Sequence, residues 1–148
     1  LTYMVSAARL IMSGVLDRFP DLRISFFEGG IGWVPWLMKT LNHHTLSASP
    51  GTTSVNDFFR KRDKLKRAPS DYFDQFYIAA IAWEDYLPQI VEVWPNHNII
   101  IGSDFDHGDA ISTWPNTIAP IKAMKGISEE DKEKILGGNA MRLFGMKG

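Results

Sequence analysis

Apolar and polar positions along the first third of the chain predict a helix, a short strand and a second helix. Apolar residues recur at near-helical spacing over residues 4–18, which is the pattern of an amphipathic helix. The β-branched and aromatic run 22–27 predicts a buried strand, and the double glycine after it predicts a turn. A second helix is expected over about 32–46, where Pro35 suits the first helical turn.

The same order of elements repeats through the rest of the chain. The apolar segment YIAAIAW, residues 77–83, predicts a strand that ends at Glu84 and Asp85. The segment NIIIGSD, residues 98–104, predicts a third strand with an abrupt change of polarity at its end. Helices are expected over 71–76, 85–94, 115–124, 128–136 and 139–144.

Two serines are expected to cap helices. Ser70 precedes DYFDQF, and Ser128 precedes Glu129, Glu130 and Asp131. A serine side chain can accept a hydrogen bond from the free amides of the first turn, and acidic residues there suit the positive end of the helix. The segment SEED is therefore a strong signal for the start of a helix.

Alternating helices and strands predict an α/β fold with a parallel sheet and right-handed crossovers. In such sheets, binding and catalytic groups gather beyond the carboxyl ends of the strands. All three predicted strands end in acidic residues, so a shared site is one interpretation; the other is that loops are polar in general. The residues concerned are Glu28, Glu84, Asp85, Asp104, Asp106 and His107.

Composition narrows the classes of protein and partner. With 148 residues, of which 45% are hydrophobic, the chain has the size and apolar content of one folded domain. A net charge of -1 indicates neither a nucleic-acid partner nor a membrane. Because no apolar run could span a bilayer and no signal peptide is recognisable, we expect a soluble, cytoplasmic protein. Without cysteine, the available metal ligands are His, Asp and Glu.

Asp104 is the most informative single residue. It directly follows the apolar run IIIGS, and a carboxylate at the mouth of a buried strand needs a cation or a hydrogen-bond donor to offset its desolvation. Zinc or manganese is one such partner, and a carboxylate beside metal-bound water can also act as a general base. The alternative is that Asp104 only caps a turn after the strand.

Four further residues are candidates for weaker or structural roles. His107 lies three residues after Asp104, where it could bind substrate or only form a hydrogen bond within its loop. Trp33 and Trp114 could form the wall of a pocket, although packing in the core is the safer interpretation for tryptophan. His97 lies at the opposite, amino end of its strand, so we expect it to be structural.

Four segments carry a wider resemblance. They are GVLDRFPDLRISFFEGGIGWVPWLMKTLNHH, LKRAPSDYFDQFYIAA, NIIIGSDFDHGDAISTWP and ISEEDKEKILGGNAMRLFG. These segments resemble successive landmarks of the amidohydrolase-related family of the amidohydrolase superfamily. That family contains aminocarboxymuconate-semialdehyde decarboxylase and resorcylate-type decarboxylases. The resemblance runs in order through essentially all 148 residues.

The resemblance implies a (β/α)8 barrel with a divalent metal at its carboxyl rim. Residues 22–27, 76–82 and 98–103 then correspond to the sixth, seventh and eighth strands, and the whole chain is the carboxyl-terminal part of one barrel domain. Asp104 matches the family's eighth-strand aspartate, which binds the metal or positions its water. Glu28 stands where the decarboxylases carry a histidine, and this departure favours hydrolysis over decarboxylation.

The resemblance also implies metal ligands that this sequence lacks. A His-x-His or Glu-x-His motif lies on the family's first strand, and a further histidine ligand lies on its fifth. Three parallel strands alone leave open sheet edges and a bare apolar face. We therefore expect either an amino-terminal half or a second copy of the chain to cover them, and the family's frequent homodimers also favour a homo-oligomer.

Three functions follow as hypotheses. The first is the carboxyl-terminal half of a metal-dependent hydrolase that acts on a small carboxylic or amide-type derivative through metal-activated water. In that hypothesis Asp104 and Glu28 are catalytic, Asp104 also binds the metal, and His107 and Trp33 bind the substrate. The second is a metal-dependent, non-oxidative decarboxylase of an aromatic or unsaturated acid. The third is a catalytically incomplete half-barrel that acts as a structural or self-associating unit.

Overall fold

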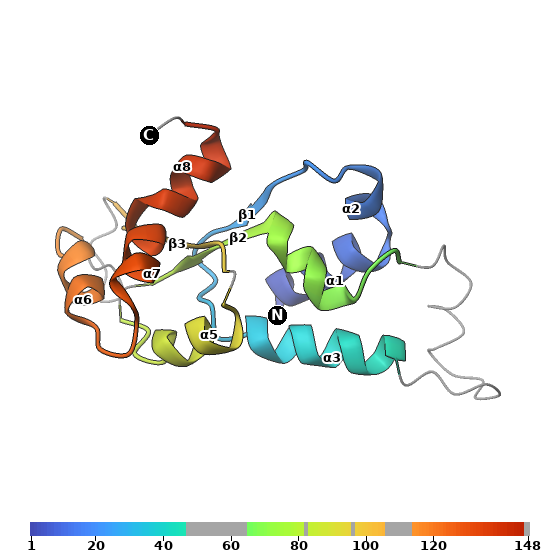
Figure 1. Cartoon of the computed structure of the whole chain (residues 1–148), viewed down its shortest axis with the longest axis horizontal. Helices are drawn as coiled ribbons and strands as arrows, with labels where there is room; N and C mark the ends of the chain where they lie inside the picture. The colour runs from blue at the N-terminus through green and yellow to red at the C-terminus, as the bar shows by residue number, and fades with distance from the viewer. Residues whose placement is uncertain (47–64, 82, 96, 106–113, 147–148) are drawn as a thin grey trace. The chain divides into compact units, whose positions relative to one another are not determined.

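The computed structural model describes residues 1–46, 65–81, 83–95, 97–105 and 114–146 (Figure 1). The chain divides into two compact units. The first consists of residues 1–22 and 33–75, and the second consists of residues 23–32 and 76–148.

The described elements of the first unit are helical. They are α1 (Thr2–Met12), α2 (Val15–Arg18), α3 (Val34–Leu46) and the 3-10 helix η1 (Pro69–Gln75). The single helix predicted over residues 4–18 is wrong, because α1 ends before Gly14 and α2 begins after it. Gly14 has a φ of 69°, and glycine adopts this left-handed conformation without the steric penalty of a side chain.

Ser70 links two helices of the first unit instead of capping one. It lies inside η1, so the predicted N-cap is wrong. Its backbone N–H donates to Oδ1 of Asn42 at 2.9 Å, and Nδ2 of Asn42 donates to the Ser70 hydroxyl at 2.9 Å. This reciprocal pair holds η1 against α3.

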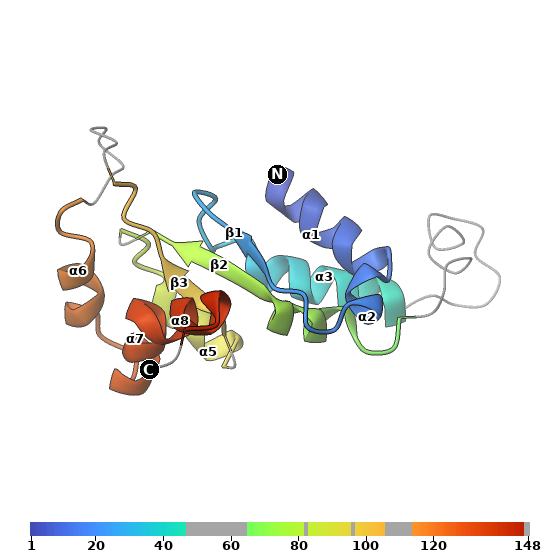
Figure 2. The ribbon, with the colours of Figure 1, turned by 90° about the horizontal axis from the view of Figure 1, so that it is seen from above.

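The second unit contains a three-stranded parallel sheet in the order β1-β2-β3 (Figure 2). Its elements are β1 (Ile24–Phe26), β2 (Phe76–Ala80), α5 (Leu87–Val93), β3 (Ile99–Ile101), α6 (Ile118–Ala123), α7 (Glu129–Glu133), the π-helix η2 (Lys134–Gly138) and α8 (Asn139–Phe144). The predicted α/β class and parallel pairing are confirmed. The strands are shorter than their apolar runs, because residues at one or both ends of each run lie outside the strand.

Both faces of the sheet are packed with apolar side chains. On one face, Tyr77, Ala79 and Ile100 form a buried cluster against Ala140 and Leu143 of α8. On the other, Phe26 and Phe76 meet edge to face, with ring centroids 5.4 Å apart. All five residues of β2 are buried, which is the pattern of a central strand in a parallel sheet.

Ser128 caps α7 as its sequence predicts. Its hydroxyl accepts a hydrogen bond from the Asp131 backbone N–H at 3.1 Å, and its own φ and ψ of -64° and 154° are extended. The helix predicted over 128–136 is nevertheless divided, because the backbone changes to the π-helix η2 after Glu133.

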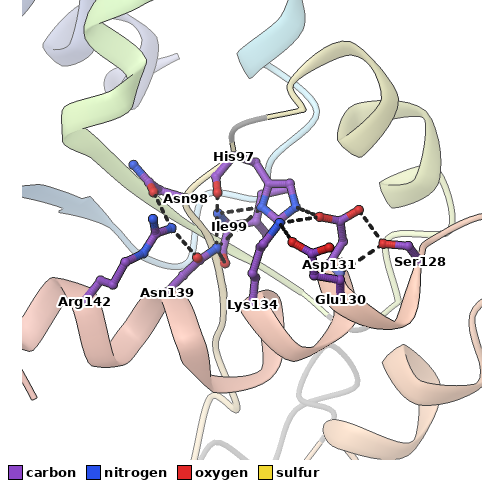
Figure 3. Close-up of polar contacts among 9 residues, drawn as sticks. All are labelled: His97, Asn98, Ile99, Ser128, Glu130, Asp131, Lys134, Asn139 and Arg142. Atoms are coloured by element: carbon purple, nitrogen blue, oxygen red, sulfur yellow. Dashed lines mark hydrogen bonds and ion pairs between the residues drawn. The ribbon is translucent and has the colours of Figure 1, made fainter. Parts of the chain in front are cut away.

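His97 is buried at the amino end of β3, with 2% of its surface exposed (Figure 3). Its Nδ1 accepts a hydrogen bond from the Ile99 backbone N–H at 3.4 Å and lies 3.5 Å from the amide nitrogen of Asn139. These donors place the ring proton on Nε2, which lies 3.5 Å from the Asp131 carboxylate. Burial lowers the pKa of His97, and Asp131 opposes that shift only in part.

Asn139 connects the start of α8 to β3 (Figure 3). It is fully buried, and its amide donates to the carbonyls of Ile99 at 2.7 Å and His97 at 3.3 Å. Its own carbonyl accepts from Arg142 at 2.5 Å. His97 and Asn139 thus connect the start of β3 to α7 and α8.

No helix in the described residues combines the length and the apolar character that crossing a membrane requires.

Candidate functional site

The parallel sheet brings three loops to one edge. Residues 27–32 follow β1, residues 81–86 follow β2 and residues 102–105 follow β3, all at the carboxyl ends of neighbouring parallel strands. We call these segments the rim loops, excluding residue 82, which lies outside the described residues. They carry Glu28, Glu84 and Asp104, one from each strand, so the expected common edge of these three carboxylates is present.

Glu28 and Asp104 share an uncommon backbone conformation. Glu28 has a φ of 59° and Asp104 a φ of 52°, and no other non-glycine residue in the described part of the chain has a positive φ. This conformation costs an L-residue roughly 1–2 kcal/mol, and such residues concentrate at functional sites. Both residues predicted as catalytic therefore stand on strained backbone just beyond a strand. Glu28 is exposed, whereas Asp104 is half-buried.

Glu84 occupies a different environment from the other two carboxylates. Its side chain is fully buried, and Oε1 accepts hydrogen bonds from the Ile31 backbone N–H at 2.8 Å and the Tyr86 hydroxyl at 2.5 Å. Oε2 accepts from the Ile81 backbone N–H at 2.8 Å. Three hydrogen bonds to an ionised acceptor offset the cost of burying its charge. Glu84 thus connects two rim loops. From the sequence this structural role could not be distinguished from a catalytic one, because both kinds of carboxylate follow a strand in the same pattern.

Tyr86 was not among the residues that the sequence singled out. Burial raises the pKa of its hydroxyl far above the ordinary value, and the hydrogen bond to Glu84 raises it further. The hydroxyl therefore stays protonated and remains a donor to Glu84 at any ordinary pH. A tyrosine two residues after a rim carboxylate gives no recognisable signal in the sequence, so only the structure could identify it.

Large aromatic side chains are exposed on or next to the rim loops. Phe27, Trp83, Phe105 and Trp114 are 43%, 53%, 69% and 52% exposed. Phe105 and Trp114 meet edge to face with ring centroids 5.0 Å apart. For Trp114 the sequence favoured packing in the core over the wall of a pocket, and its exposure contradicts core packing. Phe27 and Phe105 were not singled out from the sequence.

The two predicted substrate-binding residues, Trp33 and His107, are not part of the described rim loops. Trp33 is half-buried just before α3 and belongs to the first unit, whereas Glu28 and Asp104 belong to the second. His107 and its neighbour Asp106 lie outside the described residues. Substrate binding by Trp33 and His107 therefore stays a prediction.

A metal site is not complete within the described residues. No group of three or more His, Asp or Glu side chains in this part of the chain lies close enough together to hold an ion. Among the rim carboxylates, that of Glu84 already accepts three hydrogen bonds, and Asp104 is the one that the resemblance assigns to a metal.

Comparison with known proteins identifies the family. The family model described as Amidohydrolase matches residues 4–146. The chain is 27% identical over 140 residues to the 2-amino-3-carboxymuconate-6-semialdehyde decarboxylase of Dictyostelium discoideum, a match that covers 93% of the chain and 35% of the relative. It is 30% identical over 149 residues to the gamma-resorcylate decarboxylase of Polaromonas sp. strain JS666, covering 95% of the chain and 39% of the relative.

Solved structures agree with this family. An amidohydrolase from Mycobacterium avium subsp. paratuberculosis matches with a TM-score of 0.70 and 25% identity, over 95% of this chain and 32% of that one. The 5-carboxyvanillate decarboxylase of Sphingomonas paucimobilis matches with a TM-score of 0.65 and 28% identity, over 97% and 39%. A dihydroxybenzoic acid decarboxylase of Polaromonas sp. JS666, solved with manganese and 2-nitroresorcinol, has a TM-score of 0.64 and 22% identity over 96% and 39%, which shows the fold alone.

These matches cover almost the whole chain but only 32% to 39% of each relative. They confirm the predicted family and leave the activity of any longer protein to be proposed. Since the family model spans residues 4–146 and both curated relatives are decarboxylases, the chain belongs to the amidohydrolase family, in the group of aminocarboxymuconate-semialdehyde decarboxylase.

Proposed function

We propose that this chain forms the carboxyl-terminal part of a (β/α)8 barrel enzyme. Three parallel strands with their helices, and a TM-score of 0.70 to part of a longer amidohydrolase, support this architecture. In it, β1, β2 and β3 take the positions of the sixth, seventh and eighth strands. The other strands would pair with β1 and β3, the two outer strands of the present sheet.

The reaction we favour for the complete barrel is non-oxidative decarboxylation of a small aromatic or unsaturated acid. The observation that carries this choice is the strained, half-buried Asp104 at the end of β3, in a chain whose curated relatives are both decarboxylases. In decarboxylation the bond between the substrate carbon and its carboxylate breaks, and CO2 leaves. The electron pair that stays on the carbon then takes a proton that comes from water, and Asp104 is proposed to assist this transfer.

Hydrolysis of a carboxylic or amide-type derivative is the second candidate. Glu28 favours it, because the resemblance implies a histidine at this position in the decarboxylases. In hydrolysis Asp104 would instead take a proton from the attacking water and pass it to the leaving group. The names of the relatives outweigh this single departure, so decarboxylation replaces hydrolysis as our first choice.

The remaining sequence-based hypotheses apply to the complete protein. Asp104 would provide one ligand of a divalent metal, either zinc or manganese, with the other ligands supplied by strands outside this sequence. Such a metal would hold acidic oxygens of the substrate. His107 and Trp33 are proposed to contact the substrate. The third hypothesis, a self-associating unit without activity, applies to the 148 residues by themselves.

The deciding experiment compares Asp104→Asn with wild type in the protein encoded by the complete reading frame. CO2 release from a panel of aromatic acids is measured alongside hydrolysis of the matching amides and esters. Removing a proton-transfer group typically lowers turnover about 10²- to 10⁴-fold, and we expect a loss of that size for Asp104→Asn. Asp21→Asn, an exposed aspartate of the first unit, is the matched control and should retain full turnover.

The outcomes separate the hypotheses. CO2 release that depends on Asp104 supports the decarboxylase, and cleavage of amides or esters without CO2 release supports the hydrolase. Wild-type turnover in Asp104→Asn would remove Asp104 from the mechanism of either. If the 148-residue chain alone binds no stoichiometric metal and turns over no substrate, but sediments as an oligomer, the third hypothesis holds for the isolated chain.

A further inference from the structure

Glu84 accepts hydrogen bonds from two rim loops that are far apart in sequence. It accepts one backbone N–H from Ile31, 53 residues away in the loop after β1, and another from Ile81 at the end of β2. The Tyr86 hydroxyl is the third donor. Two of these donors are backbone amides of the loops themselves. By accepting from both, the carboxylate fixes both loops at the carboxyl edge of the sheet.

The loop after β1 is shaped to receive this carboxylate. Gly30 has a φ of 62°, and a Cβ added there would lie 2.9 Å from Oε1 of Glu84. A Cβ added at Gly32 would lie 3.2 Å from the Tyr86 ring. Side chains at these two positions would push the backbone away from Glu84 and Tyr86, so the glycines of the segment EGGIG permit the close approach.

Glu28 is only two residues from Gly30 and has left-handed backbone of its own, with a φ of 59°. Such a conformation persists only where the surrounding structure holds it, because an extended or helical backbone is preferred by roughly 1–2 kcal/mol. The hydrogen bond from Ile31 to Glu84 fixes the chain three residues after Glu28. Glu84 is therefore placed to hold the loop after β1 in the backbone conformation that gives Glu28 its positive φ.

We propose that Glu84 is a positioning residue that holds Glu28 in its left-handed conformation at the rim, and that Glu84 itself does not touch substrate. The catalytic part of this statement rests on the proposed function, in which Glu28 belongs to the site. The structural part, a carboxylate that fixes the loop after β1, does not depend on any activity. Two measurements keep the two parts separate.

The first measurement is amide hydrogen exchange of the 148-residue chain with Glu84→Gln. The amide group of glutamine is nearly the same size but replaces one acceptor oxygen by a donor, which opposes at least one of the three donors. We expect exchange of the Ile31 or Ile81 amide to accelerate by about tenfold or more, while that of Ile78 in β2 is unchanged. Glu92→Gln, an exposed glutamate of α5, is the matched control and should alter none of them.

Uniform acceleration of all three amides would mean that Glu84 only contributes to global stability, and that outcome overturns the proposal. Unchanged exchange at both Ile31 and Ile81 overturns it as well. These results are independent of catalysis, so they remain decisive even if the complete protein proves not to be a decarboxylase.

The second measurement is a double-mutant cycle for turnover in the complete protein. Glu84→Gln should lower turnover about tenfold or more in the wild-type background and should change it little once Glu28→Gln is present, because a residue that acts through Glu28 has nothing left to position. Equal losses in both backgrounds overturn the link to Glu28. Absence of any wild-type turnover refutes the proposed function. The hydrogen-exchange result still tests whether Glu84 fixes the loop after β1.

Discussion

Asn139 allows the contribution of one buried side chain to be worked out from its contacts. It is fully buried at the start of α8, and its amide donates to two carbonyls at the start of β3, those of Ile99 at 2.7 Å and His97 at 3.3 Å. Alanine at this position would remove both donors and leave the two carbonyls buried without these hydrogen bonds. It would also remove the carbonyl that accepts from Arg142.

The expected cost follows from these three hydrogen bonds. An ordinary hydrogen bond contributes about 1 kcal/mol net, and a buried acceptor left without its donor costs about 1–3 kcal/mol. The bond to Arg142, an exposed residue, contributes little beyond this. Asn139→Ala should therefore lower the free energy of unfolding by about 2–4 kcal/mol, a large fraction of the stability of an ordinary domain.

Urea denaturation of the chain, followed by circular dichroism, measures this loss as a shift of the midpoint at constant slope. Asn139→Asp separates the two halves of the side chain, because it keeps an acceptor for Arg142 but has no donor for the carbonyls of His97 and Ile99. Near neutral pH it should cost at least as much as alanine. If either variant loses less than about 0.5 kcal/mol, the donors of Asn139 do not hold α8 to β3 and the reasoning is refuted.

Three further predictions follow. The free energy of unfolding of the wild-type chain should fall as pH drops below about 6.5, by at most about 1.4 kcal/mol per pH unit. The reason is that burial lowers the pKa of His97, so that in this range the unfolded chain binds a proton that the folded chain does not. His97→Gln should lose this pH dependence, and equal slopes in the two proteins would contradict the prediction. Ser128→Ala should cost about 1 kcal/mol in urea denaturation through loss of the α7 cap, and an unchanged midpoint would count against the cap. Gly30→Ala should destabilise the chain by about 2 kcal/mol or more, because the new Cβ meets the Glu84 carboxylate. The loss should be smaller when Glu84→Ala has removed that carboxylate, and strictly additive losses in the double variant would show that the contact is unimportant.

The sequence predicted the order of elements well because the apolar runs are distinct. The five buried residues of β2 and the three isoleucines of β3 leave few alternatives to parallel strands once helices separate them. Boundaries were less predictable, since Gly14 interrupts a continuous apolar stripe only through its backbone conformation. Ser70 failed as a cap because Asn42, a residue 28 positions earlier, offers it a better pair of hydrogen bonds.

In the candidate site too, features within one segment could be predicted from the sequence, whereas contacts between separate segments could not. Asp104 and Glu28 could be selected from the sequence, because a carboxylate directly after a buried strand is visible in one segment. Their left-handed backbone could not, since φ depends on how the loops are held. Tyr86 and the contact between Gly30 and Glu84 involve residues from separate loops, which no periodicity connects.

Glu84 shows how an acidic residue at the carboxyl edge of the sheet can have a structural role. A buried carboxylate that already accepts two backbone amides and a hydroxyl, as Glu84 does, has its charge compensated and gains little from a substrate or a cation. It would have to break those bonds to take part in chemistry, and the loops would lose their connection. Asp104 and Glu28 instead stand on backbone that the fold maintains at a cost, which is difficult to explain unless the position of the side chain matters. Reactive and supporting carboxylates can thus follow neighbouring strands with the same sequence pattern, and for Glu84 the three hydrogen bonds that it accepts indicate the supporting role.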